Sequence, residues 1–319
     1  MSKFITLSNG VKMPTVGLGT WQAGPGEVEN ALRIALDNGY RQIDTAAAYQ
    51  NEEEIGKVLN EYISSGKIKR EELFIVTKLF WIFSRAEDVE PQIKQQLAKL
   101  QLDYLDLYLL HTPIALDHTH SALDNSVVLT DTWKAMEKVY EKKLTRAIGV
   151  SNFNADQIER IQKIAMVPIH NNQLEVHLYF NQKELQAVCK KHNISVTAYA
   201  PLGSPGRTNL PLPNGFKATF GAAPNPLENA SVVRLAKKYN KTPGQILLRH
   251  LVQRDIAVIP KSTNEKRLKE NFDIYDFNFT KDEMDELNNA PQRPRLFNLE
   301  FMAGHVEDPF ADERPALKK

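Results

Sequence analysis

FIVTKLFWIFSRAEDVEPQIKQQLAKLQLDYLDLYLL, residues 74–110, contains two apolar runs separated by an amphipathic segment. The runs Phe74–Thr77 and Leu105–Leu110 have the length and apolar content of buried strands. Between them, apolar residues recur at helical spacing, at Val89, Ile93, Leu97 and Leu100. This strand–helix–strand order is typical of two parallel strands joined by a crossover helix.

The same alternation extends from about residue 16 to residue 273. The other strand-like runs are Val16–Leu18, Gln42–Asp44, Ala147–Val150, Asn171–Leu174, Ser195–Tyr199 and Ile256–Ile259. Further helical stripes are Val28, Ala31, Leu32, Ala35 and Leu36; Ile55, Val58, Leu59, Tyr62 and Ile63; and Leu185, Val188 and Cys189. Eight strands alternating with helices predict a parallel sheet, and eight strands close into a barrel that its own side chains fill. We therefore predict an α/β fold, a (β/α)8 TIM barrel that forms a single domain over residues 1–319.

The competing architecture is an open, doubly wound sheet. That fold usually carries the phosphate-binding pattern G-x-G-x-x-G after its first strand. Here Gly17–Gln22 reads GLGTWQ and lacks the third glycine. The sequence therefore favours the barrel.

Three segments lie outside the alternation. At the N-terminus, Phe4–Leu7 and Val11–Met13 flank an Asn9-Gly10 pair, which predicts a β-hairpin. Residues 204–229 are rich in Pro, Gly and Asn and follow the seventh strand, and residues 290–319 follow the last helical stripe. Loops of this length in a compact domain are usually functional or disordered. In a barrel, we expect both to lie over the C-terminal face.

Composition limits the kinds of partner that the chain can have. It has 319 residues, 42% hydrophobic and 25% charged, with a formal net charge of +1, so no strong field attracts nucleic acid or a membrane surface. The single cysteine, Cys189, excludes an internal disulfide and falls on a helical stripe, which favours a buried thiol. The sequence shows no secretory signal and no apolar run long enough to span a bilayer. We expect a cytoplasmic monomer that binds neither nucleic acid nor membrane.

Ionisable residues follow three successive strands of the predicted barrel. Asp44, Lys78 and His111 stand at these strand ends, and Tyr49 follows Asp44 by five residues. Active sites of such barrels lie at the C-terminal ends of the strands. A tyrosine with a pKa near 10 catalyses proton transfer at neutral pH only when a cation stabilises its phenolate, and Lys78 is a candidate for that cation. The alternative is an Asp44–Lys78 ion pair that only braces two strands.

A second cluster follows the last strand. Lys261-Ser262-Thr263-Asn264 leads into a helical segment that carries Lys266, Arg267, Glu270 and Asn271. Cations in the first turn of a helix oppose its dipole, but an anion bound there reverses the sign, with backbone N–H groups, Lys261, Ser262 and Arg267 around it. The alternative is a solvated basic face balanced by nearby glutamates.

At this point the motifs identify a family. The chain resembles the aldo-keto reductases over nearly its whole length, in particular their aldose reductase and aldehyde reductase branch. Asp44–Gly56, DTAAAYQNEEEIG, is similar to the signature D-x-A-x-x-Y-x-N-E-x-x-x-G. The other matching stretches are GLGTW at 17–21, VTKLF at 76–80, YLLHTP at 108–113, IGVSNF at 148–153, NQLE at 172–175, AYAPLGSP at 198–205, IPKS at 259–262 and EDPF at 307–310.

The resemblance implies an oxidoreductase that reduces aldehydes and ketones with NADPH. Asp44, Tyr49, Lys78 and His111 would form the catalytic tetrad, with Tyr49 as general acid. Residues 204–229 would be a loop on the cofactor side, and residues 290–319 a tail over the active site. The implied cofactor-binding residues are Gly19, Thr20, Trp21, Ser151, Asn152, Gln173, Tyr199, Leu202, Ser204, Lys261, Ser262, Arg267, Glu270 and Asn271. Within this set, Tyr199 would stack on the nicotinamide, and Lys261, Ser262 and Arg267 would bind the 2′-phosphate, which favours NADPH over NADH.

Departures from the family pattern bear on the substrate. Thr112 stands where relatives close to aldose reductase carry a tryptophan, and Phe80 stands where a tryptophan is common. With Trp21 and the small Ala48, these residues are the expected pocket walls, and they predict a pocket wide enough for bulky ketones. Ala200 replaces a common serine after Tyr199, which removes one possible cofactor hydrogen bond.

Two other functions stay open at this stage. One is a lyase that uses Lys78 as a Schiff-base nucleophile. The other is a non-catalytic NADPH-binding protein of the same fold, with a regulatory or structural role. No metal site is expected, because His118 and His120 have no third ligand near them in the sequence.

Overall fold

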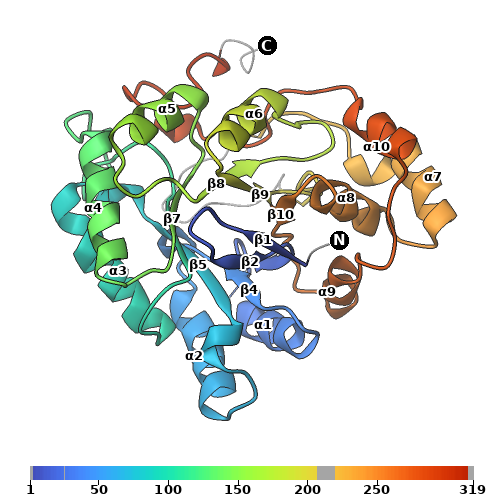
Figure 1. The fold of residues 1–319 in the computed structure, drawn as a ribbon, viewed down its shortest axis with the longest axis horizontal. Coiled ribbons are helices and arrows are strands. Elements are labelled where there is room, and N and C mark those ends of the chain that lie inside the picture. The colour runs from blue at the N-terminus through green and yellow to red at the C-terminus, as the bar shows by residue number, and fades with distance from the viewer. Residues whose placement is uncertain (1–2, 25, 207–219, 315–319) are drawn as a thin grey trace.

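A computed structural model of the chain describes residues 3–24, 26–206 and 220–314. Among these residues, eight parallel strands form one sheet in which each strand pairs with the next along the chain (Figure 1). They are β3 (Gly17–Gly19), β4 (Gln42–Asp44), β5 (Phe74–Leu79), β6 (Leu107–Leu110), β7 (Ile148–Ser151), β8 (Asn171–Glu175), β9 (Ser195–Tyr199) and β10 (Ile256–Val258). All eight predicted strands are confirmed, with ends displaced by at most two residues.

The sheet closes on itself between its first and last strands. Val16 forms a parallel bridge with Val258, and Gly19 forms another with Lys261. A Cβ atom at Gly19 would lie 2.5 Å from the carbonyl oxygen of Ile259, so only glycine lets the two strands come together here. The predicted (β/α)8 TIM barrel is therefore confirmed.

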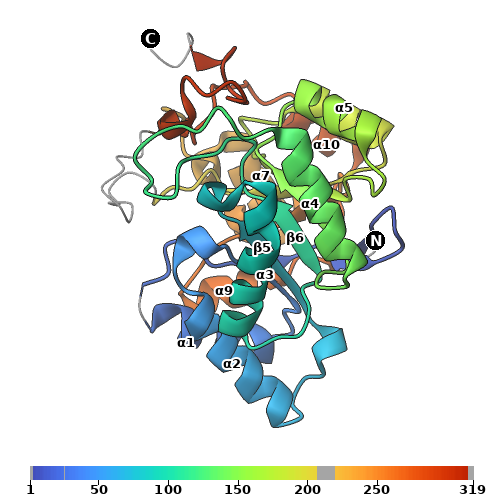
Figure 2. The same cartoon turned by 90° about the vertical axis from the view of Figure 1, so that its left-hand side faces the viewer.

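Helices surround the barrel on its outside (Figures 1 and 2). Those of the described residues are α1 (Glu27–Asp37), α2 (Glu52–Ser64), α3 (Ala86–Leu100), α4 (Leu129–Glu141), α5 (Ala155–Ile164), α6 (Lys183–Lys191), α7 (Ala230–Tyr239), α8 (Pro243–Val252), α9 (Glu265–Phe272) and α10 (Lys281–Asn288). The stripes predicted from the sequence lie in α1, α2, α3 and α6, and Cys189 is fully buried as expected.

Two local features show how the sequence fixes these helices. α8 begins with a capping box, because the Thr242 side chain accepts from Gln245 N–H at 3.3 Å and the Gln245 side chain accepts from Thr242 N–H at 2.9 Å. Gly56 lies where α2 crosses α3, and a Cβ atom there would overlap the backbone carbonyl of Lys99. Glycine therefore sets how closely these two helices pack.

The N-terminal hairpin covers one end of the barrel. β1 (Phe4–Thr6) and β2 (Lys12–Pro14) pair antiparallel, as the Asn9-Gly10 turn predicts. In Figure 1 they cross the centre of the barrel. The apolar side chains packed together here are Leu7, Met13, Phe74, Val76, Leu107, Leu109, Ala147 and Ala257. This plug closes the end where the strands begin, so a site has room only at the other end.

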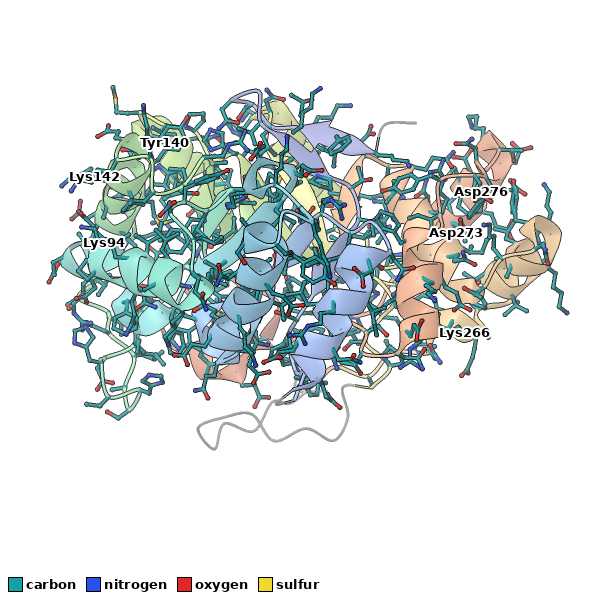
Figure 3. The ribbon with its side chains drawn as sticks, turned by 90° about the horizontal axis from the view of Figure 1, so that it is seen from below. Lys94, Tyr140, Lys142, Lys266, Asp273 and Asp276 are labelled. Carbon is teal, nitrogen blue, oxygen red and sulfur yellow. The ribbon has the colours of Figure 1, made fainter. Side chains whose placement is uncertain are left out.

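Charged side chains lie on the outer surface, among them Lys94, Lys142, Asp273 and Asp276 (Figure 3). Lys94 and Lys142 both contact Glu90, at 2.8 and 2.6 Å, and Asp273 and Asp276 both lie 2.8 Å from Lys241. In the part of the chain that the structure describes, no helix is long and apolar enough to cross a membrane. The same residues contain no group of three or more His, Cys, Asp and Glu side chains suited to a metal ion.

The two long segments predicted outside the repeat are described in part. Residues 207–219 of the loop and 315–319 of the tail lie outside the described residues. The tail carries the short turn η7 (Glu300–Met302), where buried Met302 packs with Ile82, Ile114 and Leu116. The tail therefore lies against the loops that follow β5 and β6.

Candidate active site

Three of the predicted catalytic side chains meet at the ends of β4 and β5. Asp44 ends β4, Lys78 lies in β5, and Tyr49 lies in the short turn η1 (Ala47–Tyr49) after β4. Lys78 Nζ is 2.5 Å from Asp44 Oδ1, 2.8 Å from the Thr45 carbonyl oxygen and 3.5 Å from Tyr49 Oη. The Lys78 side chain is fully buried, so one ammonium group joins a carboxylate to a phenol away from water.

Burial and Lys78 set the charge states of this cluster. Burial acts to lower the pKa of the Lys78 ammonium, but Asp44 and Tyr49 outweigh it and raise this pKa above its ordinary value. Burial raises the pKa of Asp44, against the opposing effects of Lys78 and Gln173. Burial also raises the pKa of Tyr49, and Lys78 opposes that rise. At neutral pH Lys78 is therefore a charged ammonium in contact with Asp44, beside a protonated phenol.

His111 follows β6 and faces the same cluster. Its ring centroid lies 5.7 Å from that of Tyr49 and 5.4 Å from that of Trp81. Burial and, secondarily, Lys78 hold the pKa of His111 well below its ordinary value. Its Nδ1 atom is buried and has no hydrogen-bond partner among the described residues. His111 is thus a neutral imidazole at neutral pH.

A chain of short polar contacts fixes the turn that carries Tyr49. The Asn51 side chain donates to the Thr20 carbonyl oxygen at 2.9 Å and accepts from Thr45 Oγ1 at 3.0 Å. Thr20 Oγ1 in turn donates to the Asp44 carbonyl oxygen at 2.9 Å. These bonds link the ends of β3 and β4, so they hold the backbone on both sides of Tyr49.

A buried network braces β5 on the side facing away from the barrel interior. Glu52 Oε1 accepts from Thr77 Oγ1 at 2.6 Å and from Gln96 Nε2 at 2.8 Å. The same Gln96 amide nitrogen lies 3.2 Å from the Lys78 carbonyl oxygen. Glu52 belongs to the family signature, but its partners in α3 and β5 could not be predicted from the sequence.

The residues expected around the nicotinamide are neighbours on β7, β8 and β9. Tyr199 Oη donates to Asn152 Oδ1 at 2.8 Å, and Asn152 Nδ2 donates to the His111 carbonyl oxygen at 3.0 Å. Ser151 Oγ donates to the Gln173 carbonyl oxygen at 3.0 Å. Gln173 Nε2 donates to Asp44 Oδ2 at 2.7 Å, a contact the sequence did not predict. Gln173 therefore supports the Asp44 carboxylate with one amide N–H and keeps its amide oxygen and its second N–H for a ligand.

The cluster after β10 lies at the N-terminus of α9. The Asn264 side chain caps this helix by accepting from Arg267 N–H at 3.0 Å, so that N–H, one of those expected to face an anion, is already bonded. Ser262 is 5% exposed and accepts from Asn264 N–H at 3.1 Å. Partial burial lowers the pKa of Lys261, Glu27 opposes this effect, and the charge of Arg267 adds to it. Two cations therefore lie near each other, with no carboxylate within 4.0 Å of either among the described residues.

The other predicted members of this set lie around them. Glu270 contacts Lys266 at 3.8 Å, and Asn271 is 6% exposed. At the seventh strand end, Leu202 packs against the core, and Ser204 adopts a left-handed backbone with φ 45°. At the first strand end, the Gly19 backbone pairs with Lys261, the Thr20 side chain is bonded within the protein, and Trp21 contacts the tail.

Two of the expected substrate walls are direct neighbours of Tyr49 and His111 in the chain. Ala48 directly precedes Tyr49 in η1, and Thr112 directly follows His111 with its buried Oγ1 unpaired among the described residues. The Phe80 ring packs against Trp81 at 4.6 Å and His120 at 5.0 Å.

Two aromatic residues of the tail, Phe297 and Phe301, shape this region together with Trp81, and sequence reasoning missed both of them. Trp81 packs on His111, and Phe301 of the tail packs on Trp81 at 4.9 Å. Phe297 lies edge-on to Trp21 at 5.7 Å and to Tyr199 at 5.5 Å. The only sequence signal of Phe297 and Phe301 was their aromatic character within the tail. That signal does not indicate which ring each of them contacts.

Comparison with known proteins agrees with this geometry. A family model described as Aldo/keto reductase family matches residues 15–291. A chicken (Gallus gallus) protein named aldo-keto reductase family 1 member A1 is 44% identical, over 97% of this chain and 98% of the relative. The human protein of that name is 43% identical, over 89% of this chain and 88% of its own length. The chain therefore belongs to the aldo/keto reductase family.

Solved structures lead to the same conclusion. An aldose reductase from Schistosoma japonicum superposes with a TM-score of 0.88 at 39% identity, covering 98% of this chain and all of that chain. An aldo-keto reductase from Bombyx mori, solved in complex with NADP, superposes with a TM-score of 0.87 at 38% identity, covering 96% and 98% of the two chains.

Proposed function

We propose that this chain is an NADPH-dependent carbonyl reductase that converts aldehydes and ketones to alcohols, with Tyr49 as proton donor. The observation that carries the proposal is the buried Lys78 ammonium, held by Asp44 at 2.5 Å and lying 3.5 Å from Tyr49 Oη. A phenol is a weak acid at neutral pH, and a fixed cation beside it stabilises the phenolate that remains after proton transfer. Family membership supports the same class of reaction.

The charge state of His111 supports Tyr49 as the acid. An imidazole whose pKa lies well below its ordinary value holds no acidic proton to give at neutral pH. A neutral imidazole still donates one hydrogen bond. We assign His111 the role of holding the carbonyl oxygen close to Tyr49 Oη.

The residues at both ends of the site fit NADPH. Bound NADPH would supply hydride to the carbonyl carbon. Tyr199 would stack on the nicotinamide, with Ser151, Asn152 and the Gln173 amide oxygen available to its carboxamide. Lys261 and Arg267, two neighbouring cations without a carboxylate contact in the described residues, suit a 2′-phosphate. The NADP complex of the Bombyx mori relative supports this assignment.

A wide substrate pocket is a further part of the proposal. The residues directly beside Tyr49 and His111 in the chain, Ala48 and Thr112, are small, although the Trp81 ring packs on His111. We expect bulky ketones to be reduced alongside aldehydes. Comparing kcat/KM for a bulky cyclic ketone and a short aliphatic aldehyde tests this, and a strong preference for the short aldehyde would contradict it.

The reaction class is tested by following NADPH absorbance at 340 nm with a panel of aldehydes and ketones. Turnover that requires both NADPH and a carbonyl compound supports the proposal. Tight NADPH binding without turnover of any carbonyl compound would favour the non-catalytic alternative. Borohydride trapping of a covalent adduct on Lys78 would favour the lyase. A cytoplasmic location and a monomeric state stay predictions.

A further inference from the structure

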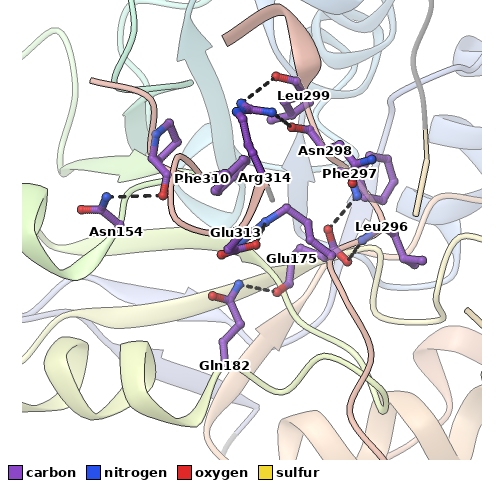
Figure 4. Close-up of polar contacts among 12 residues, drawn as sticks. Asn154, Glu175, Gln182, Leu296, Phe297, Asn298, Leu299, Phe310, Glu313 and Arg314 are labelled. Atoms are coloured by element: carbon purple, nitrogen blue, oxygen red, sulfur yellow. Dashed lines mark hydrogen bonds and ion pairs between the residues drawn. The ribbon is translucent and has the colours of Figure 1, made fainter. Parts of the chain in front are cut away.

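Glu175 is a buried carboxylate that the proposed reaction does not use. It ends β8, is fully buried, and accepts hydrogen bonds on both oxygens (Figure 4). Oε1 accepts from Leu296 N–H at 2.8 Å and Oε2 accepts from Phe297 N–H at 2.9 Å. His177 Nε2 lies 2.9 Å from Oε1. Burying a charge costs free energy. A buried carboxylate that accepts from two consecutive backbone N–H groups therefore suggests a specific role for Glu175.

Separate contacts hold the rest of the tail. Arg295 pairs with Glu313 through two bonds of 2.9 Å and lies over the Phe310 ring at 3.6 Å. The Asn154 side chain donates to the Pro309 carbonyl oxygen at 3.3 Å. These contacts would keep the far end of the tail in place without Glu175. The Glu175 bonds instead fix the tail at Leu296–Phe297, one of the points where it reaches the site.

That point is the Phe297 ring. It is 8% exposed and meets Trp21, which follows β3, and Tyr199, which ends β9. Tyr199 is bonded to Asn152, and Asn152 is bonded to the backbone of His111. A shift of the tail backbone at residue 297 would therefore displace side chains on both sides of the site.

The end of the cofactor-side loop meets the same two tail residues. Phe220 forms an antiparallel bridge with Phe297, and Gly221 N–H donates to the Leu296 carbonyl oxygen at 2.8 Å. A Cβ atom at Gly221 would overlap the Arg295 carbonyl. Leu296 thus bonds Glu175 through its N–H and the loop end through its carbonyl, so the carboxylate holds the junction of loop and tail.

We propose that Glu175 is a positioning residue: its carboxylate fixes the backbone at Leu296–Phe297 and so sets the Phe297 ring as a wall against the bound carbonyl substrate. This inference rests on the proposed function, because it assigns Phe297 a contact with the substrate of that reaction. Glu175 acts only through the tail and takes no part in proton transfer.

Glu175→Gln is the test variant, because the amide keeps the shape of the carboxylate. Its NH2 group faces one of the two tail N–H groups. That tail N–H group then loses its acceptor. Glu184→Gln, the same change at an exposed position in α6, is the matched control. Hydrogen–deuterium exchange of peptides that contain Leu296 and Phe297 measures the anchor directly. We expect about tenfold faster exchange in Glu175→Gln and no change in Glu184→Gln.

Steady-state reduction of 4-nitrobenzaldehyde measures the consequence for the site. We expect KM to rise about tenfold in Glu175→Gln, in Phe297→Ala and in the double variant alike, with kcat within about threefold of the wild type. Unchanged exchange or KM in Glu175→Gln, or effects that multiply to about a hundredfold in the double variant, would overturn the inference. If the wild type reduces no carbonyl compound, the proposed function fails instead, and the exchange measurement still decides whether Glu175 anchors the tail.

Discussion

Replacing Asp44 with asparagine isolates the charge that holds Lys78. In the wild type, the fully buried Lys78 Nζ lies 2.5 Å from Asp44 Oδ1. The asparagine keeps the shape but leaves the ammonium without an anion in contact. We expect Lys78 to be neutral in the folded variant, because a buried ammonium without a partner is less favourable than a buried amine.

The loss of folding free energy in Asp44→Asn follows from the proton that Lys78 loses. Lysine has an ordinary pKa of about 10.4, so keeping it neutral at pH 7 costs about 4.6 kcal/mol at about 1.36 kcal/mol per pH unit. That figure is an upper limit and falls within the range of about 3–5 kcal/mol for removing one partner of a buried ion pair. At about 2 °C per kcal/mol, the melting temperature at pH 7 falls by roughly 6–10 °C.

The stability of the Asp44→Asn variant should change with pH in one direction. The unfolded variant binds one proton more than the folded variant, so its stability rises with pH. The deficit relative to the wild type should shrink by about 1.4 kcal/mol per pH unit between pH 7 and pH 9. Differential scanning calorimetry at pH 7, 8 and 9 measures it, with Asp131→Asn as a control that removes an exposed pair with Lys134. A deficit below about 2 °C at pH 7, or one that does not change with pH, would refute the reasoning.

Three further predictions follow from the site and its scaffold. Arg267→Met should raise the KM for NADPH about tenfold and leave the KM for NADH unchanged, whereas Lys266→Met on the exposed helix surface should change neither, as initial rates with each cofactor will show. Burial raises the pKa of Tyr49 and lowers that of His111. The kcat/KM for reduction should therefore be flat from pH 6 to pH 9 and fall only as Tyr49 loses its proton. An inflection near pH 6.5 would indicate an imidazole acid instead. Gly56→Ala should lower the melting temperature by several degrees without changing kcat in the folded fraction, because the methyl group overlaps the backbone of α3.

The barrel and the proximity of Asp44, Lys78 and His111 were predictable because local patterns indicate them. Alternating apolar runs and helical stripes defined the strands to within two residues, and barrels of this type place their sites at strand ends. Asp44, Lys78 and His111 could therefore be grouped before any distance was known. The Asn9-Gly10 turn predicted the hairpin in the same way, from chemistry within a few residues.

Contacts between distant segments could not be predicted in this way. Nothing near Glu175 in the sequence indicates that its carboxylate meets the backbone at 296–297, more than a hundred residues later. The sequence predicts Gln173 as a cofactor-binding residue, but it does not indicate that one amide N–H also bonds Asp44, which it does because β8 faces β4 across the barrel interior. The Asn264 side chain caps α9, since Asn competes well for a helix N-terminus. Such contacts depend on how the barrel closes and on the course of the C-terminal tail across it. The spacing of apolar residues in the sequence indicates neither of these.

The most direct test of the central claim is the rate of NADPH-dependent carbonyl reduction by Tyr49→Phe, with NADPH affinity measured on the same protein by fluorescence titration. The variant keeps the ring and removes only the hydroxyl that lies 3.5 Å from Lys78 Nζ. We predict that kcat falls by about a thousandfold, within the range for loss of a general acid, while the dissociation constant for NADPH stays within about twofold. A variant that retains more than about a tenth of wild-type turnover would contradict the assignment of Tyr49 as the proton donor.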